Sequence, residues 1–219
     1  MTDAGDARTV ARAGSTVGEV ALRRRGPHTE LIVNGAFVMD TVDVSTEVAL
    51  AEVALRRHEA PQRVLVGGLG LGYTAAAVLA DARVQELTVV EIAEPLIDWA
   101  REGLLPTALD DPRTHLRLGD VGEVVSATPG EWDLILLDVD NGPGFLVRED
   151  NADLYAGAGL AAAAGALAAG GVLAIWSSHP APELLAALRS LRRGTPEEVL
   201  RRVERDGRTL EYGIYLLQT

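Results

Sequence analysis

The sequence predicts an α/β fold built on one doubly wound, seven-stranded sheet that is mostly parallel and ends in an antiparallel hairpin. Three observations support this fold class. Short apolar segments alternate with helical patterns from residue 63 onward, a glycine-rich turn follows the first of these strands, and a two-residue turn near the C-terminus separates two further strand patterns. A chain of 219 residues is long enough to bury one sizeable core of this kind.

The N-terminal part of the chain has a different pattern. Residues 1–15 are small and polar without an apolar period, so we expect them to be disordered. Residues 16–44 are expected to form a small β unit, with strands at 19–24 and 30–33 and a tight hairpin turn at Asn34-Gly35. The α/β domain then occupies residues 45–219.

A helix is expected to open this domain. Apolar Val48, Ala51 and Leu55 recur at helical spacing, and Ser45 is available as the N-cap. Five strand-helix units are then expected. Their strands are at 63–66, 87–91, 115–118, 134–138 and 172–176, and their helices are at 73–82, 95–101, 121–127, 152–169 and 182–191.

The C-terminal part closes the sheet. Strand patterns at 199–205 and 208–217 flank Asp206-Gly207, a two-residue hairpin turn, so these strands are expected to pair antiparallel. Five strand-helix units followed by a hairpin are typical of the class I methyltransferase (Rossmann-like) sheet. The nicotinamide-binding sheet lacks this ending.

Composition excludes several classes of function. The chain has no cysteine and only four scattered histidines, so we expect no disulfide, no thiol chemistry and no metal site. A net charge of −12 argues against binding of nucleic acid and is compatible with a cationic substrate such as an amine. No segment resembles a signal peptide or a membrane span, and a cytoplasmic protein is therefore expected.

The glycine-rich turn is the first candidate binding feature. It follows an apolar strand and opens a helix, the context in which a backbone approaches a nucleotide or nucleoside closely. Glu91, at the end of the next strand, is placed to accept hydrogen bonds from ribose hydroxyls. The alternative for the glycine turn is a role in packing alone, and the alternative for Glu91 is an acid that faces solvent at a strand end. The cofactor-binding set that we predict is Gly67, Gly68, Leu69, Gly70, Gly72, Glu91, Ile92, Asp120 and Val121.

Two further acids follow strands. Asp120 is placed to accept a hydrogen bond from an adenine amino group, although Asp120 and Glu123 also form a helix-start pattern. Asp138 ends the fourth strand, with Asp140 beside it, and both are candidate catalytic acids. The carboxyl ends of parallel strands meet at one edge of an open sheet, so we expect a single site there. The loop at 140–151 is a candidate lid.

Candidates for an acceptor pocket are Glu47, Tyr155, Trp176 and His179. Each also has a structural interpretation. Glu47 lies in the first turn of a helix, Tyr155 and Trp176 are suited to the core, and His179 precedes a helix.

The chain resembles the spermidine and spermine synthases and their spermidine-synthase-like relatives. The resemblance covers about residues 30–176. It rests on the segments Val66-Gly67-Gly68-Leu69-Gly70-Leu71-Gly72, Val89-Val90-Glu91-Ile92, Asp111-Pro112-Arg113, Leu118-Gly119-Asp120, Asp133-Leu134-Ile135-Leu136-Leu137-Asp138 and Gly170-Gly171-Val172-Leu173. It implies that Glu91 holds the ribose, that Asp120 holds the adenine and that Asp138 deprotonates an attacking amine. Family members commonly dimerise, so a homodimer is one expectation.

The chain departs from the family pattern at three places. Gly70 stands where the family turn carries an acid, Asp138-Val139-Asp140-Asn141-Gly142-Pro143 shortens the family's Asp-Ser-Ser-Asp-Pro segment, and Thr46-Glu47 replaces its Tyr-His or Tyr-Gln pair. Loss of an acid near the cofactor tail removes repulsion against a carboxylate. We therefore expect ordinary S-adenosylmethionine as cofactor and methyl transfer to a small acceptor. The alternatives are a polyamine aminopropyltransferase that uses decarboxylated S-adenosylmethionine, and a non-catalytic nucleoside-binding paralogue.

Overall fold

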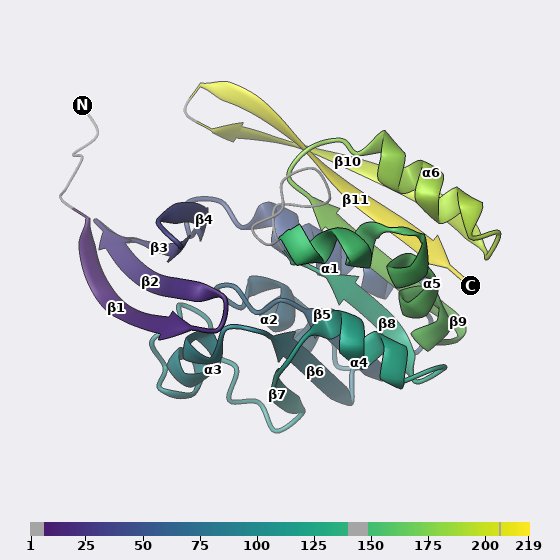
Figure 1. Cartoon of the computed structure of the whole chain (residues 1–219), viewed down its shortest axis with the longest axis horizontal. Coiled ribbons are helices and arrows are strands. Elements are labelled where there is room, and N and C mark those ends of the chain that lie inside the picture. Colours follow the sequence, from purple (N-terminus) through teal and green to yellow (C-terminus); the bar gives the residue numbers. More distant parts are fainter. Residues whose placement is uncertain (1–6, 140–148, 206) are drawn as a thin grey trace.

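The computed structural model describes residues 7–139, 149–205 and 207–219 and contains two β-sheets (Figure 1). The larger sheet has seven strands in the order β10-β11-β9-β8-β5-β6-β7. Strands β5 to β9 run parallel, and β11 pairs antiparallel with both β9 and β10. The doubly wound α/β fold with a C-terminal hairpin is confirmed.

The elements of this sheet follow the predicted alternation. They are β5 (Arg63–Gly67), α2 (Tyr73–Leu79), β6 (Glu86–Glu91), α3 (Glu94–Arg101), β7 (Thr114–Leu118), α4 (Val121–Ala127), β8 (Trp132–Leu137), the 3-10 helix η1 (Glu149–Tyr155), α5 (Gly157–Ala166), β9 (Leu167–Ser177), α6 (Pro182–Ser190), β10 (Thr195–Arg205) and β11 (Arg208–Gln218). Among the described helices, none is long and apolar enough to cross a bilayer.

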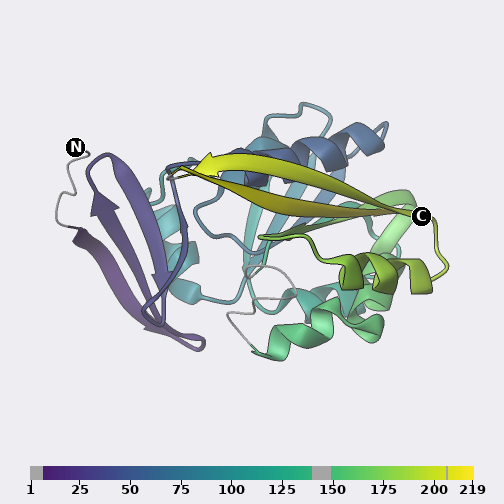
Figure 2. The same cartoon turned by 90° about the horizontal axis from the view of Figure 1, so that it is seen from above.

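Two apolar layers bury the two faces of the sheet. Alternate side chains of a strand point to opposite faces, so Leu134 and Leu136 of β8 pack in one layer while Ile135 and Leu137 pack in the other. Helices α1 (Ser45–Arg57), α2 and α3 cover the first layer, and α4, α5 and α6 cover the second. Figure 2 shows α1, in blue, and α5, in green, on opposite sides of the sheet.

The N-terminal residues form the second sheet, which is antiparallel in the order β1-β2-β3-β4. Its strands are β1 (Arg8–Ser15), β2 (Gly18–Arg25), β3 (His28–Val33) and β4 (Ala36–Asp40). The predicted turn at Asn34-Gly35 is present, with both residues at positive φ (51° and 77°), as a tight hairpin requires.

The predicted disorder of residues 1–15 is wrong for 8–15, and the β unit starts earlier than residue 16. Strand β1 pairs with β2 along its whole length, and Ala11 and Ala13 pack against the first apolar layer. The small size of these side chains hid the pattern, because alanine carries little hydrophobic signal. Residues 1–6 lie outside the described part.

Two local predictions also differ from the structure. Helix α1 has Val44 as its N-cap instead of Ser45, and the Asp43 carboxylate accepts the Ser45 N–H (2.9 Å). The helix expected at 152–169 ends at Ala166, and β9 starts at Leu167. A Cβ on Gly171 would lie within 3.1 Å of the carbonyl oxygens of residues 132, 133 and 168. This close strand pairing overrides the helical preference of the alanine run.

The Asp111-Pro112-Arg113 motif has a structural role. The Arg113 guanidinium donates hydrogen bonds to the carbonyl oxygens of Leu79 (2.7 Å) and Val84 (3.0 Å) and to the Asp111 carboxylate. These bonds tie the end of α2 to the start of β7, the edge strand of the large sheet.

We predict that the N-terminal sheet unfolds together with the α/β domain, because Leu22 (1% exposed) and Leu31 pack in the same apolar layer as α1, α2 and α3. Leu22→Ala should lower the free energy of unfolding of the whole protein by about 2–5 kcal/mol. Val10→Ala, at an exposed bulge of β1 (39%), should change it by less than about 0.5 kcal/mol. Chemical denaturation measures both values, and a separate early transition in Leu22→Ala would contradict a shared core.

Candidate active site

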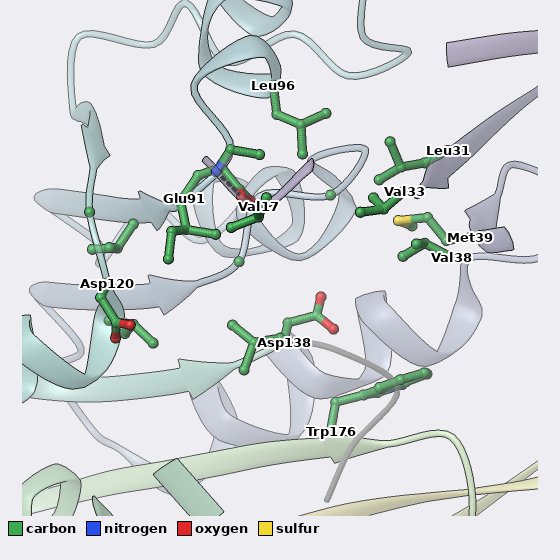
Figure 3. Close-up of a pocket in the computed structure, with 18 of the residues that line it drawn as sticks. Val17, Leu31, Val33, Val38, Met39, Glu91, Leu96, Asp120, Asp138 and Trp176 are labelled. Carbon is green, nitrogen blue, oxygen red and sulfur yellow. Dashed lines mark hydrogen bonds between the residues drawn. The ribbon is translucent and has the colours of Figure 1, made fainter. Parts of the chain in front are cut away.

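A cavity lies at the carboxyl ends of β5, β6 and β8, between the large sheet and the N-terminal sheet (Figure 3). The predicted residues that line it are Glu47, Gly68, Gly70, Glu91, Ile92, Asp120, Val121, Asp138 and Trp176, the last of which also packs in the core. In Figure 3, Asp120 and Glu91 lie toward one end, Asp138 lies in the middle, and side chains of the N-terminal sheet lie at the other end. The structure therefore brings together acids that are far apart in the sequence.

The glycine turn approaches the chain after β8 closely. Gly68 has a φ of 89°, and a Cβ there would lie 2.2 Å from the Asp138 carbonyl oxygen. The Asp138 N–H donates to the Gly67 carbonyl oxygen (2.8 Å), and the Gly68 N–H donates to that of Val90 (2.9 Å). The absence of a side chain thus lets the turn pack against the strand end that carries Asp138.

Gly67, Leu69 and Gly72 do not line the cavity and pack against other parts of the chain. A Cβ on Gly67 would lie 2.8 Å from the Val121 side chain, and one on Gly72 would lie 2.2 Å from the Thr107 hydroxyl. Leu69 is buried in the core. Of the predicted turn residues, Gly68 and Gly70 face the cavity.

Glu91 holds the turn in place through its carboxylate. It is 8% exposed, and its two oxygens accept the Leu69 and Ala93 N–H groups, both at 2.8 Å. Burial raises the pKa of Glu91 above its ordinary value, and the backbone N–H bonds oppose that increase. Each carboxylate oxygen can accept a second hydrogen bond, so the predicted contact with ribose is compatible with this structural bond.

Asp120 caps a helix, which is the alternative role that the sequence left open for it. It is the N-cap of α4, and its carboxylate accepts the Gly122 N–H (2.7 Å). It also lines the cavity. Helix capping and a contact with a ligand can therefore coexist at this residue.

Asp138 projects into the middle of the cavity, where the Thr74 hydroxyl donates to its carboxylate (2.5 Å). Burial raises the pKa of Asp138 from 3.8 to about 7, the Glu47 carboxyl adds to the increase, and the Thr74 hydrogen bond opposes it. A carboxyl with such a pKa can take up or release a proton near neutral pH.

Glu47 contributes the second acid of the pair from the first turn of α1. It is 8% exposed, and its carboxylate accepts a hydrogen bond from the Thr46 hydroxyl (2.7 Å). Burial raises the pKa of Glu47, the Thr46 hydrogen bond opposes this, and Asp43 and Asp40 add to the increase. Asp138 and Glu47 therefore hinder each other's ionisation, and a cation between them would relieve that repulsion.

The cavity carries a clear charge preference. Its described lining contains four carboxyl groups, those of Glu47, Glu91, Asp120 and Asp138, and no lysine, arginine or histidine. Within the described residues there is also no group of three or more metal-ligating side chains. Such a lining favours a ligand that carries positive charge.

Two predicted acceptor residues are not brought into this cavity. Tyr155 is buried in the second apolar layer, and its hydroxyl donates to the Val139 carbonyl oxygen (2.6 Å). The His179 ring lies beside the Ser178 hydroxyl (3.2 Å) and does not line the cavity. Asp140 and most of the candidate lid at 140–151 fall outside the described residues.

Several cavity residues escaped the sequence analysis. Leu31, Val33, Val38 and Met39 of the N-terminal sheet form one wall of the cavity. Their apolar side chains gave no chemical signal. The position of the N-terminal sheet over the strand ends, which makes them part of the site, is a property of the tertiary structure.

We predict that the two cavity glycines differ in their tolerance of a side chain. Gly70→Ala should cost about 1–2 kcal/mol of unfolding free energy, because its φ is 52° and the nearest atom is Sδ of the flexible Met39 side chain. Gly68→Ala should cost more, because its Cβ would meet the backbone of Asp138. Equal costs in chemical denaturation would show that the turn does not pack this closely.

The raised pKa of Asp138 predicts a pH-dependent stability. An unfolded carboxyl with a pKa of 3.8 loses its proton before the folded one, so this residue lowers the free energy of unfolding as pH rises from 3.8 to about 7. Asp138→Asn should therefore gain stability relative to the wild type across this interval and keep the gain above it. A difference between variant and wild type that is constant with pH would disprove the pKa shift.

Comparison with known proteins identifies the family. Residues 44–194 match the model of the spermine/spermidine synthase domain. Polyamine aminopropyltransferase 2 of Pseudomonas aeruginosa is 32% identical over 52% of this chain and 35% of its own length, and the polyamine aminopropyltransferase of a Ruegeria species is 32% identical over 61% and 54%. The chain thus matches about a third to a half of the length of these relatives.

Solved structures agree on the fold. A spermidine synthase bound to the transition-state analogue AdoDATO superposes with a TM-score of 0.81 at 20% identity, over 96% of this chain and 73% of that one. The spermidine synthase of Thermotoga maritima gives a TM-score of 0.79 at 20% identity, over 96% and 72%. Because the family model covers more than half of the sequence, the chain belongs to the spermine/spermidine synthase family.

Proposed function

We propose that this protein is an aminopropyltransferase that uses decarboxylated S-adenosylmethionine and a small amine acceptor. The observation that carries the proposal is the cavity lining, in which the described residues supply four carboxyls and no basic group. The names of the relatives, polyamine aminopropyltransferases and spermidine synthases, support the same reaction. The sequence favoured methyl transfer and left aminopropyl transfer as the alternative. The names of the relatives support the alternative and give no support to methyl transfer.

The charge of the cofactor tail distinguishes the two reactions. Ordinary S-adenosylmethionine carries a carboxylate on its tail, and the described cavity offers no cation to pair with it. The decarboxylated form carries only an ammonium group there, which suits Glu47 and Asp138. The sequence predicts Glu47 only as a residue of the acceptor pocket, whereas in the structure Glu47 lines the same cavity as Gly70.

Met39 accounts for the glycine at position 70. Its Sδ would lie 2.9 Å from a Cβ on Gly70, and it accepts the Leu71 N–H at 3.4 Å. The space that an acidic side chain would need is therefore occupied by a side chain of the N-terminal sheet. We propose that Glu47 supplies the negative charge that the family turn provides at this point.

The cofactor is expected to lie along the cavity in the order of the acids. Asp120 accepts from the adenine amino group, Glu91 accepts from ribose, and the sulfonium lies beside Gly68 and Gly70, close to Asp138. The wall of Leu31, Val33 and Val38 excludes water from the reacting carbon.

The transfer is an in-line displacement. The nitrogen lone pair of the acceptor attacks the methylene carbon next to the sulfonium, and the carbon–sulfur bond breaks with its electron pair moving to sulfur. The products are a neutral thioether nucleoside and an alkylated amine. Ionised Asp138 accepts the proton that the amine loses, and Glu47 attracts the ammonium form of the acceptor into the cavity.

The proposal predicts that the decarboxylated cofactor and a linear diamine give a thioether nucleoside and an aminopropylated amine, which mass spectrometry identifies. Asp138→Asn should lower kcat by about 100-fold or more while the variant still binds the nucleoside. Methylated amine formed from ordinary S-adenosylmethionine would establish methyl transfer instead. Nucleoside binding without any turnover would indicate a non-catalytic paralogue.

The coupling of the two acids predicts a shift in the pH profile. kcat should rise with pH through about 7 as Asp138 ionises. In Glu47→Gln this rise should move to lower pH, because the Glu47 carboxyl no longer raises the pKa of Asp138. Glu52→Gln, on the exposed side of the same helix, serves as the control and should leave the profile unchanged. An unshifted pH profile in Glu47→Gln would show that Glu47 does not raise the pKa of Asp138, the proposed base.

A further inference from the structure

A second cavity adjoins the first, and Val38, Met39, Glu47 and Trp176 line both. Its remaining walls come from β4, the start of α1 and the C-terminal hairpin. Three carboxyls line it, those of Asp40, Asp43 and Glu47, together with the polar side chains of Thr46 and Tyr212. An acceptor chain that starts at Asp138 and passes Glu47 would continue into this space.

Arg205 is the one basic side chain in the described lining of either cavity. Its guanidinium donates to the Asp40 carboxylate and lies over the ring of Phe37, 5.7 Å from the ring centroid. The pair links the tip of the β10-β11 hairpin to β4, and Figure 2 shows this hairpin, in yellow, extending to the N-terminal sheet.

Both carboxylate oxygens of Asp40 accept hydrogen bonds in this arrangement. Asp40 is 5% exposed, one carboxylate oxygen accepts the Val42 N–H (3.0 Å), and the other accepts from Arg205. A buried carboxylate needs a cation or hydrogen-bond donors, and Arg205 supplies the cation from within the chain. Arg205 thus already supplies the positive charge that an ammonium group of a ligand would bring to Asp40.

We propose that Arg205 is a specificity-determining residue, which holds the far carboxylate of the acceptor cavity and thereby disfavours acceptors with an additional, more distant ammonium group. The inference rests on the proposed function, since it assumes that the acceptor is a linear amine. Short diamines reach Glu47 and Asp43 without displacing the guanidinium. Longer polyamines place an ammonium group beside the Asp40–Arg205 pair, where Arg205 already neutralises the carboxylate that would otherwise hold this group.

The test is calorimetric binding of two amines to the enzyme in the presence of the thioether nucleoside product. The probes are the four-carbon diamine and the triamine that is longer by one aminopropyl unit. Arg205→Gln should raise the affinity for the triamine about tenfold or more, because an unpaired Asp40 becomes available, and should change that for the diamine less than about threefold. Arg202→Gln is the matched control, since Arg202 is 77% exposed and pairs with Glu211 on the same hairpin.

The double variant Asp40→Asn with Arg205→Gln removes both charges and should return the preference to that of the wild type. Arg205→Lys keeps a cation but loses the planar guanidinium, so its preference between the two amines should lie between those of the wild type and Arg205→Gln. If Arg205→Gln does not fold, Arg205→Lys serves as the test in its place. The proposal would be overturned if Arg205→Gln and Arg205→Lys both kept the wild-type preference between the two amines. It would also be overturned if the gain in affinity for the triamine persisted in the double variant. Failure of the proposed function is seen separately, as absence of transfer product from the wild type with any amine.

Discussion

The close contact between the glycine turn and the end of β8 is the constraint on which the site depends. Gly68 lies against the Asp138 carbonyl oxygen, and the Asp138 N–H binds the Gly67 carbonyl. The Glu91 carboxylate fixes the next residue of the turn by accepting the Leu69 N–H. Gly68 and Gly70 of the turn therefore lie in the same cavity as the carboxyl group of Asp138, where the proposed cofactor would bind.

The charge of the cavity decides which kind of ligand this geometry favours. Two buried carboxyls, Asp138 and Glu47, share a cavity whose described lining has no basic side chain. Burial raises the pKa of both groups, and the Glu47 carboxyl raises that of Asp138 further, so a cation or a proton stabilises each of them. Both the proposed acceptor and the proposed cofactor tail carry an ammonium group, so the same acids serve attraction and proton transfer.

The N-terminal sheet and the tip of the β10-β11 hairpin meet and complete the site. The N-terminal sheet adds the apolar wall that contains Met39, and the C-terminal hairpin adds Arg205, which binds Asp40 across the second cavity. The parallel sheet supplies the acids that face the cofactor. The added elements decide how much space and charge remain for the acceptor, which is where a family that shares one sheet can vary its substrates.

The sequence by itself determined the strand-helix alternation, the antiparallel ending, the glycine turn and the acids at the strand ends, because each depends on local periodicity or on residues within one element. It also indicated the family. Only the tertiary structure decided that β1 is ordered, that Met39 fills the space beside Gly70, that Glu47 faces Asp138 and that Tyr155 and His179 lie outside the cavity. These features depend on contacts between distant segments, and burial and electric charge act through space and leave no periodic pattern along the chain.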